Sequence, residues 1–219
     1  MEILKINNLS YGYKDGDYEN MLLDNVSFVI KEGDFNIITG ESGTGKTSLL
    51  YLLAGLEKKY DGDIYYDGKD IRNNLDLYRK KDVAMIFQNY NLIDYLSVIN
   101  NIRIALQIKG FNIPDTKIKE LLKSIKIDET KFNRRVSILS GGEKQRVAIA
   151  RALLTDCKII IADEATANLD GRLSLDIINL FRNLSKENNK TVILATHNKE
   201  ICKYGDKCFN IENKKVILI

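Results

Sequence analysis

Residues 40–47 read Gly40-Glu41-Ser42-Gly43-Thr44-Gly45-Lys46-Thr47. An apolar run, 35–38, precedes them, and a leucine-rich run, 48–54, follows. A buried strand, a glycine-rich loop and a helix with the spacing G-x-x-x-x-G-K-[ST] are typical of a loop that binds phosphates. Glycines let the backbone curl so that successive N–H groups point at one anion, and the helix adds its positive end. The stretch therefore predicts a nucleoside triphosphate site.

The composition fits one globular unit. The chain has 219 residues, of which 44% are hydrophobic, which is enough for one substantial core and a small subdomain. Its 33 basic and 30 acidic residues are interspersed and leave a net charge of only +3, so nothing argues for nucleic acid as a partner. No apolar run approaches the roughly 20 residues that cross a bilayer. A membrane partner would have to supply any span.

The three cysteines are Cys157, Cys202 and Cys208. Residues 1–6 alternate like a strand and do not resemble a secretory signal, so we expect reduced, cytosolic thiols. Paired C-x-x-C spacing is missing from the sequence, and we therefore expect no metal–thiolate site.

The N-terminal part predicts strands at 2–7 and 26–30, joined by a polar segment that carries Tyr11 and Tyr13. Tyrosines beside a nucleotide loop could stack on a base, and equally could only pack against the hairpin. The pattern does not decide between these two roles.

Two acids, Asp163 and Glu164, end the apolar run 158–162. Carboxylates at the end of a buried strand are costly unless they serve a cation or a reaction. In P-loop NTPases the first acid holds Mg²⁺ and a following glutamate polarises the attacking water. The alternative is a simple strand terminator.

Polar residues also end two other strands that the sequence predicts. Gln88 follows the run 82–87, and His197, the only histidine, follows 190–196. Carboxyl ends of parallel strands form the ligand-binding edge of an α/β sheet. We therefore consider both residues for the site, against the alternatives of an ordinary loop amide and a structural histidine.

Between these strands, residues 89–157 show helical periodicity, interrupted by the only proline, Pro114. Near the end of this block, Ser140 and Glu143 fit a capping box around Gly141 and Gly142. Two glycines in a first turn cost up to about 1 kcal/mol each, but they leave N–H groups accessible at a positive helix end. We favour a second anion site over capping alone.

Taken together, these pieces resemble the nucleotide-binding subunit of ATP-binding-cassette (ABC) transporters over essentially the whole chain. The most specific element is Leu139-Ser140-Gly141-Gly142-Glu143 followed by Gln145-Arg146, which is similar to the family's signature peptide. The phosphate loop, Gln88, Asp163-Glu164, Asn168-Leu169-Asp170 and His197 occur in the family's order.

The resemblance implies an α/β fold. It consists of a P-loop NTPase (RecA-like) core with an N-terminal antiparallel β subdomain and an inserted α-helical subdomain. The chain would be a single ABC ATPase domain, 1–219, with its core at 1–88 and 158–219 and the helical subdomain at 89–157. Ala165 and Cys157 stand where the family often has proline, which implies altered local rigidity rather than lost activity.

The resemblance also implies roles for single residues. Tyr13 would stack on adenine, Glu164 would be the general base, and His197 would contact the γ-phosphate. Mg²⁺ would be held by Thr47, Gln88 and, through water, Asp163, and Gln88 would also contact the attacking water. The phosphate-binding set would be Gly40, Glu41, Ser42, Gly43, Thr44, Gly45, Lys46, Thr47 and Ser48.

Other implied roles need a second subunit. Ser140 and Gly142 would bind the γ-phosphate of ATP held by the opposite subunit, with Asp170 at the seam of a head-to-tail homodimer or pseudo-dimer. The other partner would be an integral membrane permease, with the chain cytoplasmic and peripheral at the inner face of the membrane.

Residues 161–170 look most like the ATPases of lipoprotein-release, macrolide-export and antimicrobial-peptide-resistance systems, which suggests export of a peptide, lipid-linked or antimicrobial substrate. The alternative is a non-transport ABC ATPase that serves cell-division mechanotransmission or iron–sulfur assembly.

Overall fold

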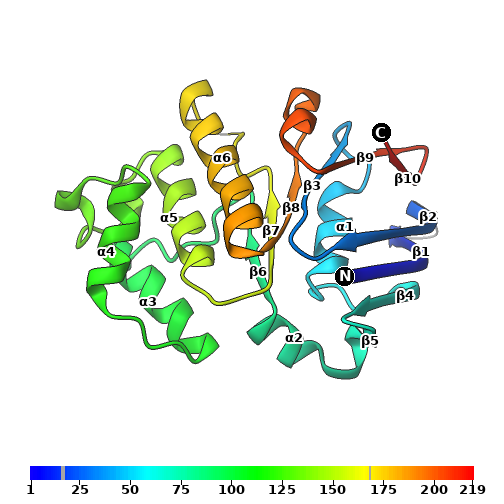
Figure 1. The fold of residues 1–219 in the computed structure, drawn as a ribbon, viewed down its shortest axis with the longest axis horizontal. Helices are drawn as coiled ribbons and strands as arrows, with labels where there is room; N and C mark the ends of the chain where they lie inside the picture. The colour runs from blue at the N-terminus through cyan, green and yellow to red at the C-terminus, as the bar shows by residue number, and fades with distance from the viewer. Residues whose placement is uncertain (16–17, 168) are drawn as a thin grey trace.

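The computed structural model describes the chain except residues 16–17 and 168, and it contains two sheets (Figure 1). The smaller sheet is antiparallel and has the strand order β2-β1-β4-β5. A long N-terminal hairpin forms most of it. Its strands are β1 (Glu2–Asp15), β2 (Tyr18–Lys31), β4 (Asp61–Tyr66) and β5 (Lys69–Asp70).

The larger sheet has the order β10-β9-β3-β8-β7-β6. All neighbouring pairs are parallel except β10 and β9, so the carboxyl ends of β3, β8, β7 and β6 meet at one edge. The strands of this sheet are β3 (Phe35–Gly40), β6 (Val83–Ile86), β7 (Ile159–Asp163), β8 (Thr191–Ala195), β9 (Lys207–Glu212) and β10 (Lys215–Leu218).

Helices cover the larger sheet and extend beyond it, with α3, α4 and α5 forming one end of the molecule (Figure 1). Pro114 is the residue before α4, which agrees with its predicted place between two helical groups. The α-helices are α1 (Lys46–Leu53), α2 (Leu75–Lys81), α3 (Val98–Lys109), α4 (Asp115–Ser124), α5 (Gly141–Leu153) and α6 (Gly171–Asn188). Short 3₁₀ helices are η1 (Ile71–Asn74), η2 (Glu129–Lys131), η3 (Val136–Ile138) and η4 (Lys199–Tyr204).

The buried side chains form three apolar clusters. One lies between the antiparallel sheet, α1 and one face of the larger sheet, and a second lies under α6 on the other face. The third joins α3, α4 and α5. Helix α5 contributes to two of them, because Ala148 and Ile149 belong to the second cluster while Val147 and Ala150 belong to the third. This helix therefore connects the helical end of the molecule to the sheet.

The N-terminal segment differs from its prediction. Tyr11 and Tyr13 lie within strand β1, where we expected a polar connection, and Tyr13 pairs with Asn20 of β2. The polar residues of this segment obscure the strand pattern, but cross-strand pairing satisfies their backbone groups. Helix α2 was also not predicted.

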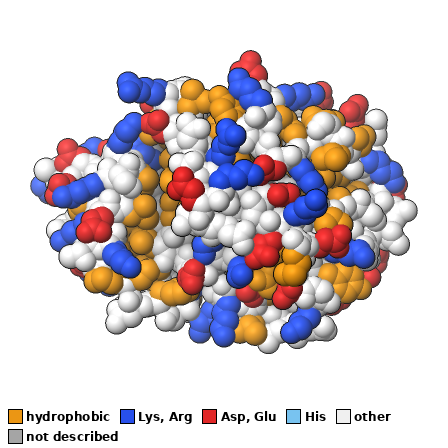
Figure 2. All heavy atoms as spheres, viewed as in Figure 1, with side chains coloured by type: hydrophobic (Ala, Val, Ile, Leu, Met, Phe, Trp, Pro, Cys, Tyr) orange, Lys and Arg blue, Asp and Glu red, His pale blue; other side chains and the backbone are white. Residues whose placement is uncertain are grey.

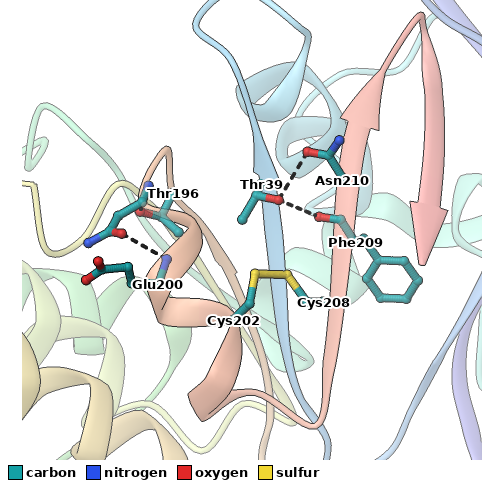
Figure 3. The surroundings of a disulfide bond; sticks show 8 residues. Thr39, Thr196, Glu200, Cys202, Cys208, Phe209 and Asn210 are labelled. Atoms are coloured by element: carbon teal, nitrogen blue, oxygen red, sulfur yellow. Dashed lines mark hydrogen bonds between the residues drawn. A yellow bond between two sulfur atoms is a disulfide. The ribbon is translucent and has the colours of Figure 1, made fainter. Parts of the chain in front are cut away.

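The expectation of reduced thiols is wrong for two of the three cysteines. Cys202 on η4 and Cys208 on β9 form a disulfide, with their Cα atoms 5.4 Å apart (Figure 3). The chain reverses between η4 and β9, and this reversal, which the spacing in the sequence does not reveal, brings the two sulfurs together. Cys157 is free and buried.

Two surface properties bear on partners. Basic and acidic side chains are mixed over the face shown in Figure 2. Among the described residues, no helix has the length and apolar character that crossing a membrane requires.

Candidate functional site

The predicted site residues of the core converge at the carboxyl edge of the larger sheet. A cavity of about 310 Å³ opens there. It brings together the loop after β3, the residue that follows β6 by two positions, and the end of β7. The described residues that line it are Tyr13, Leu22, Ser42, Gly43, Gly45, Lys46, Thr47, Ser48, Gln88, Asp163 and Glu164.

The loop 40–47 has the geometry of a phosphate cradle. Gly43 and Gly45 have φ angles of 81° and 98°, a backbone region that residues other than glycine rarely adopt. A Cβ atom at Gly43 would meet nothing within 4 Å, so the space in front of the loop is open. The buried Lys46 ammonium donates hydrogen bonds to the carbonyls of Gly40 and Glu41, both at 2.8 Å. The loop thus places the Lys46 ammonium and the start of α1 at the wall of the cavity.

The structure separates the two tyrosines that the sequence left undecided. Tyr13 lines the cavity and is 49% exposed, whereas Tyr11 packs against the first cluster and lies 3.4 Å from Glu57 through its hydroxyl. Of the two tyrosines, Tyr13 is therefore the one that can contact a ligand in this cavity. Leu22, which was not among the predicted site residues, also lines the cavity, and a Cβ atom added at Gly45 would lie 3.2 Å from the Leu22 Cβ. Nothing in the local pattern of β2 marks it.

Asp163 is the buried acid of the site. It is 2% exposed, and one carboxylate oxygen, Oδ1, has no hydrogen-bond partner among the described residues. Burial raises the pKa of Asp163 above its ordinary value, and the hydrogen bond from the Thr47 hydroxyl offsets part of that rise. A buried carboxylate oxygen without a partner, beside a hydroxyl and the Gln88 amide, suits a hard cation that prefers oxygen ligands.

Glu164 and His197 come from adjacent strands and form a pair. The His197 Nδ1 atom lies 3.0 and 3.1 Å from the two carboxylate oxygens of Glu164. The Glu164 side chain is 11% exposed, whereas that of His197 is 64% exposed. Glu164 has a φ of 49°, and a hydrogen bond from its N–H to the Ala195 carbonyl (3.0 Å) helps to hold this unfavourable backbone. The geometry orients a carboxylate at the cavity wall.

The second candidate anion site lies elsewhere. Ser140 and Glu143 form both halves of the predicted capping box, and Lys131 holds the Glu143 carboxylate at 2.6 Å. Burial raises the pKa of Glu143, but hydrogen bonds from Lys131 and Ser140 outweigh it, so the pKa lies below its ordinary value. Ser140 and Gly141 are exposed, and neither Ser140 nor Gly142 is among the described residues that line the cavity. The start of this 13-residue helix faces solvent.

Asp170 has a structural role that its sequence position did not indicate. Its side chain accepts a hydrogen bond from the Leu173 N–H at 2.9 Å and caps α6. It does not line the cavity, within the part of the chain that is described. The neighbouring Asn168, which contributed to the family resemblance, lies outside the described residues.

Gln88 is positioned by an aromatic contact. The ring of Phe87, the residue before it, packs edge-on against Tyr51 of α1 with 6.1 Å between the centroids. Burial and, to a smaller extent, the charge of Asp163 raise the pKa of Tyr51. The same α1 that begins at Lys46 therefore also supports the segment that carries Gln88.

Comparison with known proteins places this site in context. The ABC transporter family profile matches residues 23–167. The lipoprotein-releasing system ATP-binding protein LolD of Buchnera aphidicola is 37% identical over 98% of this chain and 96% of its own. The putative hemin import ATP-binding protein HrtA of Staphylococcus epidermidis is 34% identical over 97% and 98%.

The chain is also similar to a solved structure, that of the ATP-binding cassette MJ0796 of Methanocaldococcus jannaschii in a dimeric, post-hydrolysis state bound to ADP and Pi. The TM-score is 0.91 and the sequence identity is 33%, and the match covers 98% of this chain and 96% of that one.

Proposed function

Since the chain belongs to the ABC transporter family as an ATP-hydrolysing, ATP-binding subunit, we propose that it works as a head-to-tail dimer that drives a separate membrane permease. The observation that carries this proposal is the convergence of Lys46, Gln88, Asp163 and Glu164 on one cavity. The second anion site, at the exposed start of α5, does not contribute to the lining of that cavity in the described part of the chain.

Within one subunit, the loop 40–48 holds the phosphates and Tyr13 packs on the base. Glu164 accepts a proton from the attacking water as the oxygen of that water bonds to the γ-phosphorus; the bond between this phosphorus and the β–γ bridging oxygen breaks, and ADP leaves with that oxygen. His197 holds the carboxylate through Nδ1, and its exposed ring leaves Nε2 able to face the γ-phosphate. Gln88, which also lines the cavity, orients the water.

Thr47, Gln88 and Asp163 are the residues that would hold Mg²⁺. Their oxygens line one cavity, and the unpartnered Oδ1 of Asp163 fits a direct or water-mediated ligand. When bound, this cation neutralises charge on the phosphate oxygens.

The proposed mechanism uses two copies of the chain, because the start of α5 is exposed, and Ser140 and Gly142 there are not among the described residues that line the cavity. A helix N-terminus attracts anions. The start of α5, at Ser140–Gly142, can therefore bind the phosphates only of an ATP molecule that is held by another subunit. The dimeric state of the similar cassette supports the same arrangement here. ATP would then bridge two subunits, and loss of the γ-phosphate would weaken the bridge.

Mixing two inactive variants tests the shared site. Lys46→Ala removes the phosphate lysine, and Gly142→Asp places a carboxylate at the second anion site. In a head-to-tail heterodimer both defects fall in one site, so the other site is intact. We expect ATPase activity, measured by phosphate release at an ATP concentration near the wild-type Kd, to reappear on mixing although each variant alone is nearly inactive under these conditions.

The control for this experiment mixes each inactive variant with itself after the same treatment. Failure of the mixed sample to recover any activity, while cross-linking shows that heterodimers form, would contradict a site shared between subunits.

A groove beside the site supports a membrane partner. It has a volume of about 320 Å³, and Phe87 lines it while the next residue, Gln88, lines the ATP cavity. Large apolar side chains are exposed on the elements around it: Leu56 (40%), Leu77 (43%), Ile104 (39%) and Ile108 (72%). Exposed apolar groups beside a groove are typical of a protein interface. A helix of the permease docked there would sense movement of Gln88.

Substituting Ile108→Glu should release this partner. We expect a tagged chain extracted from its native membranes to retain an integral membrane protein, identified by mass spectrometry, and the Ile108→Glu variant to lose it. ATPase activity of the isolated chain should not change, because Ile108 is exposed and is not among the described residues that line the ATP cavity. Leu218→Glu, an equally polar change at a 59% exposed site on β10, is the matched control.

The outcome also distinguishes the alternatives. We propose export, on the resemblance of residues 161–170 to releasing and exporting systems and the similarity to LolD, although HrtA carries an import name. A soluble iron–sulfur scaffold recovered instead of a permease would refute transport and favour an assembly ATPase. A division protein would favour mechanical signalling.

A further inference from the structure

The segment after Gln88 has an unfavourable backbone that its surroundings must maintain. Tyr90 and Asn91 have φ angles of 61° and 46°, and neither is glycine. The left-handed region costs roughly 1 kcal/mol or more for each such residue and persists only when neighbouring groups hold it. Tyr90 lies two residues from Gln88. Contacts that fix the backbone of Tyr90 therefore also restrict the position of the Gln88 backbone.

Arg151, in the last turn of α5, supplies these contacts. Its guanidinium donates one hydrogen bond to the Tyr90 carbonyl, at 2.8 Å, and another to the Asn91 carbonyl. Among the described residues no carboxylate forms an ion pair with Arg151, so these main-chain carbonyls take up its charge. Arginine suits this task because its planar fork can reach two acceptors at once.

The same segment also reaches the other end of α5. A Cβ at Gly141 would lie only 3.1 Å from the Tyr90 hydroxyl, so this hydroxyl sits against the first turn of the helix. The segment 88–91 therefore contacts α5 at its start, beside Ser140 and Gly142, and through Arg151 at its end. Because the contacts lie at both ends of one rigid helix, segment and helix cannot shift independently.

We propose that Arg151 is a positioning residue that makes Gln88 and the signature end of α5 move as one unit. This inference rests on the proposed function. Gln88 senses ATP in the cavity of its own subunit, whereas the start of α5 binds ATP held by the partner subunit. Arg151 couples the positions of these two parts of one subunit. Arg151 touches neither ATP nor the attacking water.

A double-mutant cycle tests this coupling. We expect Arg151→Ala to lower kcat about tenfold, equivalent to roughly 1.4 kcal/mol of barrier, while Kd for ATP, measured on the monomer, changes by less than about twofold. Gln88→Ala should lower kcat as well, and the double variant should be no slower than the slower single variant. A merely structural role for Arg151 would make the two losses multiply.

Two further variants serve as checks. Arg151→Lys keeps the charge and one of the two hydrogen bonds, so it should restore part of kcat, and it keeps the test usable if Arg151→Ala unfolds. Arg103→Ala removes another arginine of the helical end, whose partner is Asp115 on α4, and should leave kcat unchanged. Melting temperatures monitor folding.

Two results would overturn the coupling and leave the role of Gln88 intact. One is losses of kcat that multiply in the double variant, and the other is full activity in both Arg151 variants while Gln88→Ala is slow. Full activity in Gln88→Ala would refute the role proposed for Gln88 itself and would overturn this inference with it.

Discussion

Replacing Glu164 by Gln is expected to reduce ATP hydrolysis by a factor of roughly 100 to 10,000, the usual contribution of a positioned general base. The amide has nearly the same shape as the carboxylate but cannot accept the proton of the attacking water. Binding should survive, because Lys46 and the phosphate loop are untouched. The variant should therefore accumulate as an ATP-bound dimer, visible by size-exclusion chromatography with ATP.

Glu32→Gln is the matched control for this variant. Glu32 pairs with Lys158 at 3.3 Å and does not line the cavity among the described residues, so its conversion to an amide should leave turnover unchanged. Wild-type turnover in Glu164→Gln would remove Glu164 from the mechanism. Slow turnover without an ATP-bound dimer would contradict the shared-site proposal instead.

Replacing Lys46 by Ala is expected to weaken ATP binding by roughly 10- to 100-fold, the effect of losing charge-assisted hydrogen bonds worth about 1.5–3 kcal/mol. Lys46 is 7% exposed, and its ammonium lies among the backbone carbonyls of the loop that it helps to shape. The variant loses both the charge that faces the phosphates and the contacts that hold Gly40 and Glu41.

Isothermal titration calorimetry with ATP measures this loss directly. Lys81→Ala removes an exposed lysine at the end of α2 and should bind ATP like the wild type. A melting curve without nucleotide separates loss of the site from loss of the fold. Unchanged ATP affinity in a folded Lys46→Ala protein would contradict the assignment of residues 40–47 as the phosphate cradle.

Local patterns predicted the core well where a single element carries its own signal. The strand at 35–40, the loop and the helix from Lys46 follow from an apolar run, glycine spacing and leucine periodicity, all read within 20 residues. The capping box at Ser140 and Glu143 is equally local, and the structure confirms it. The family resemblance is likewise confirmed by the profile match.

Other features depend on contacts between distant residues, which a pattern cannot contain. The pairing of β1 with β2 decides that Tyr13 and not Tyr11 lines the cavity, and it brings Leu22 there as well. The disulfide requires the reversal between η4 and β9. Arg151 reaches Asn91 across 60 positions of sequence, and nothing near either residue indicates this contact.

The sequence by itself predicted residues 40–47 as a phosphate loop, because eight neighbouring positions and the elements on either side carry the whole signal, and the strand and helix that flank the loop are confirmed. It also determined the family, through short motifs in a set order.

Only the tertiary structure decided how these motifs combine. Parallel pairing of β6, β7 and β8 brings Gln88, Asp163, Glu164 and His197 to one edge of the sheet. The exposed start of α5 does not line the cavity at this edge, as far as the chain is described. The physical reason is that side-chain proximity follows from strand order and helix packing, which are set by contacts across the whole chain.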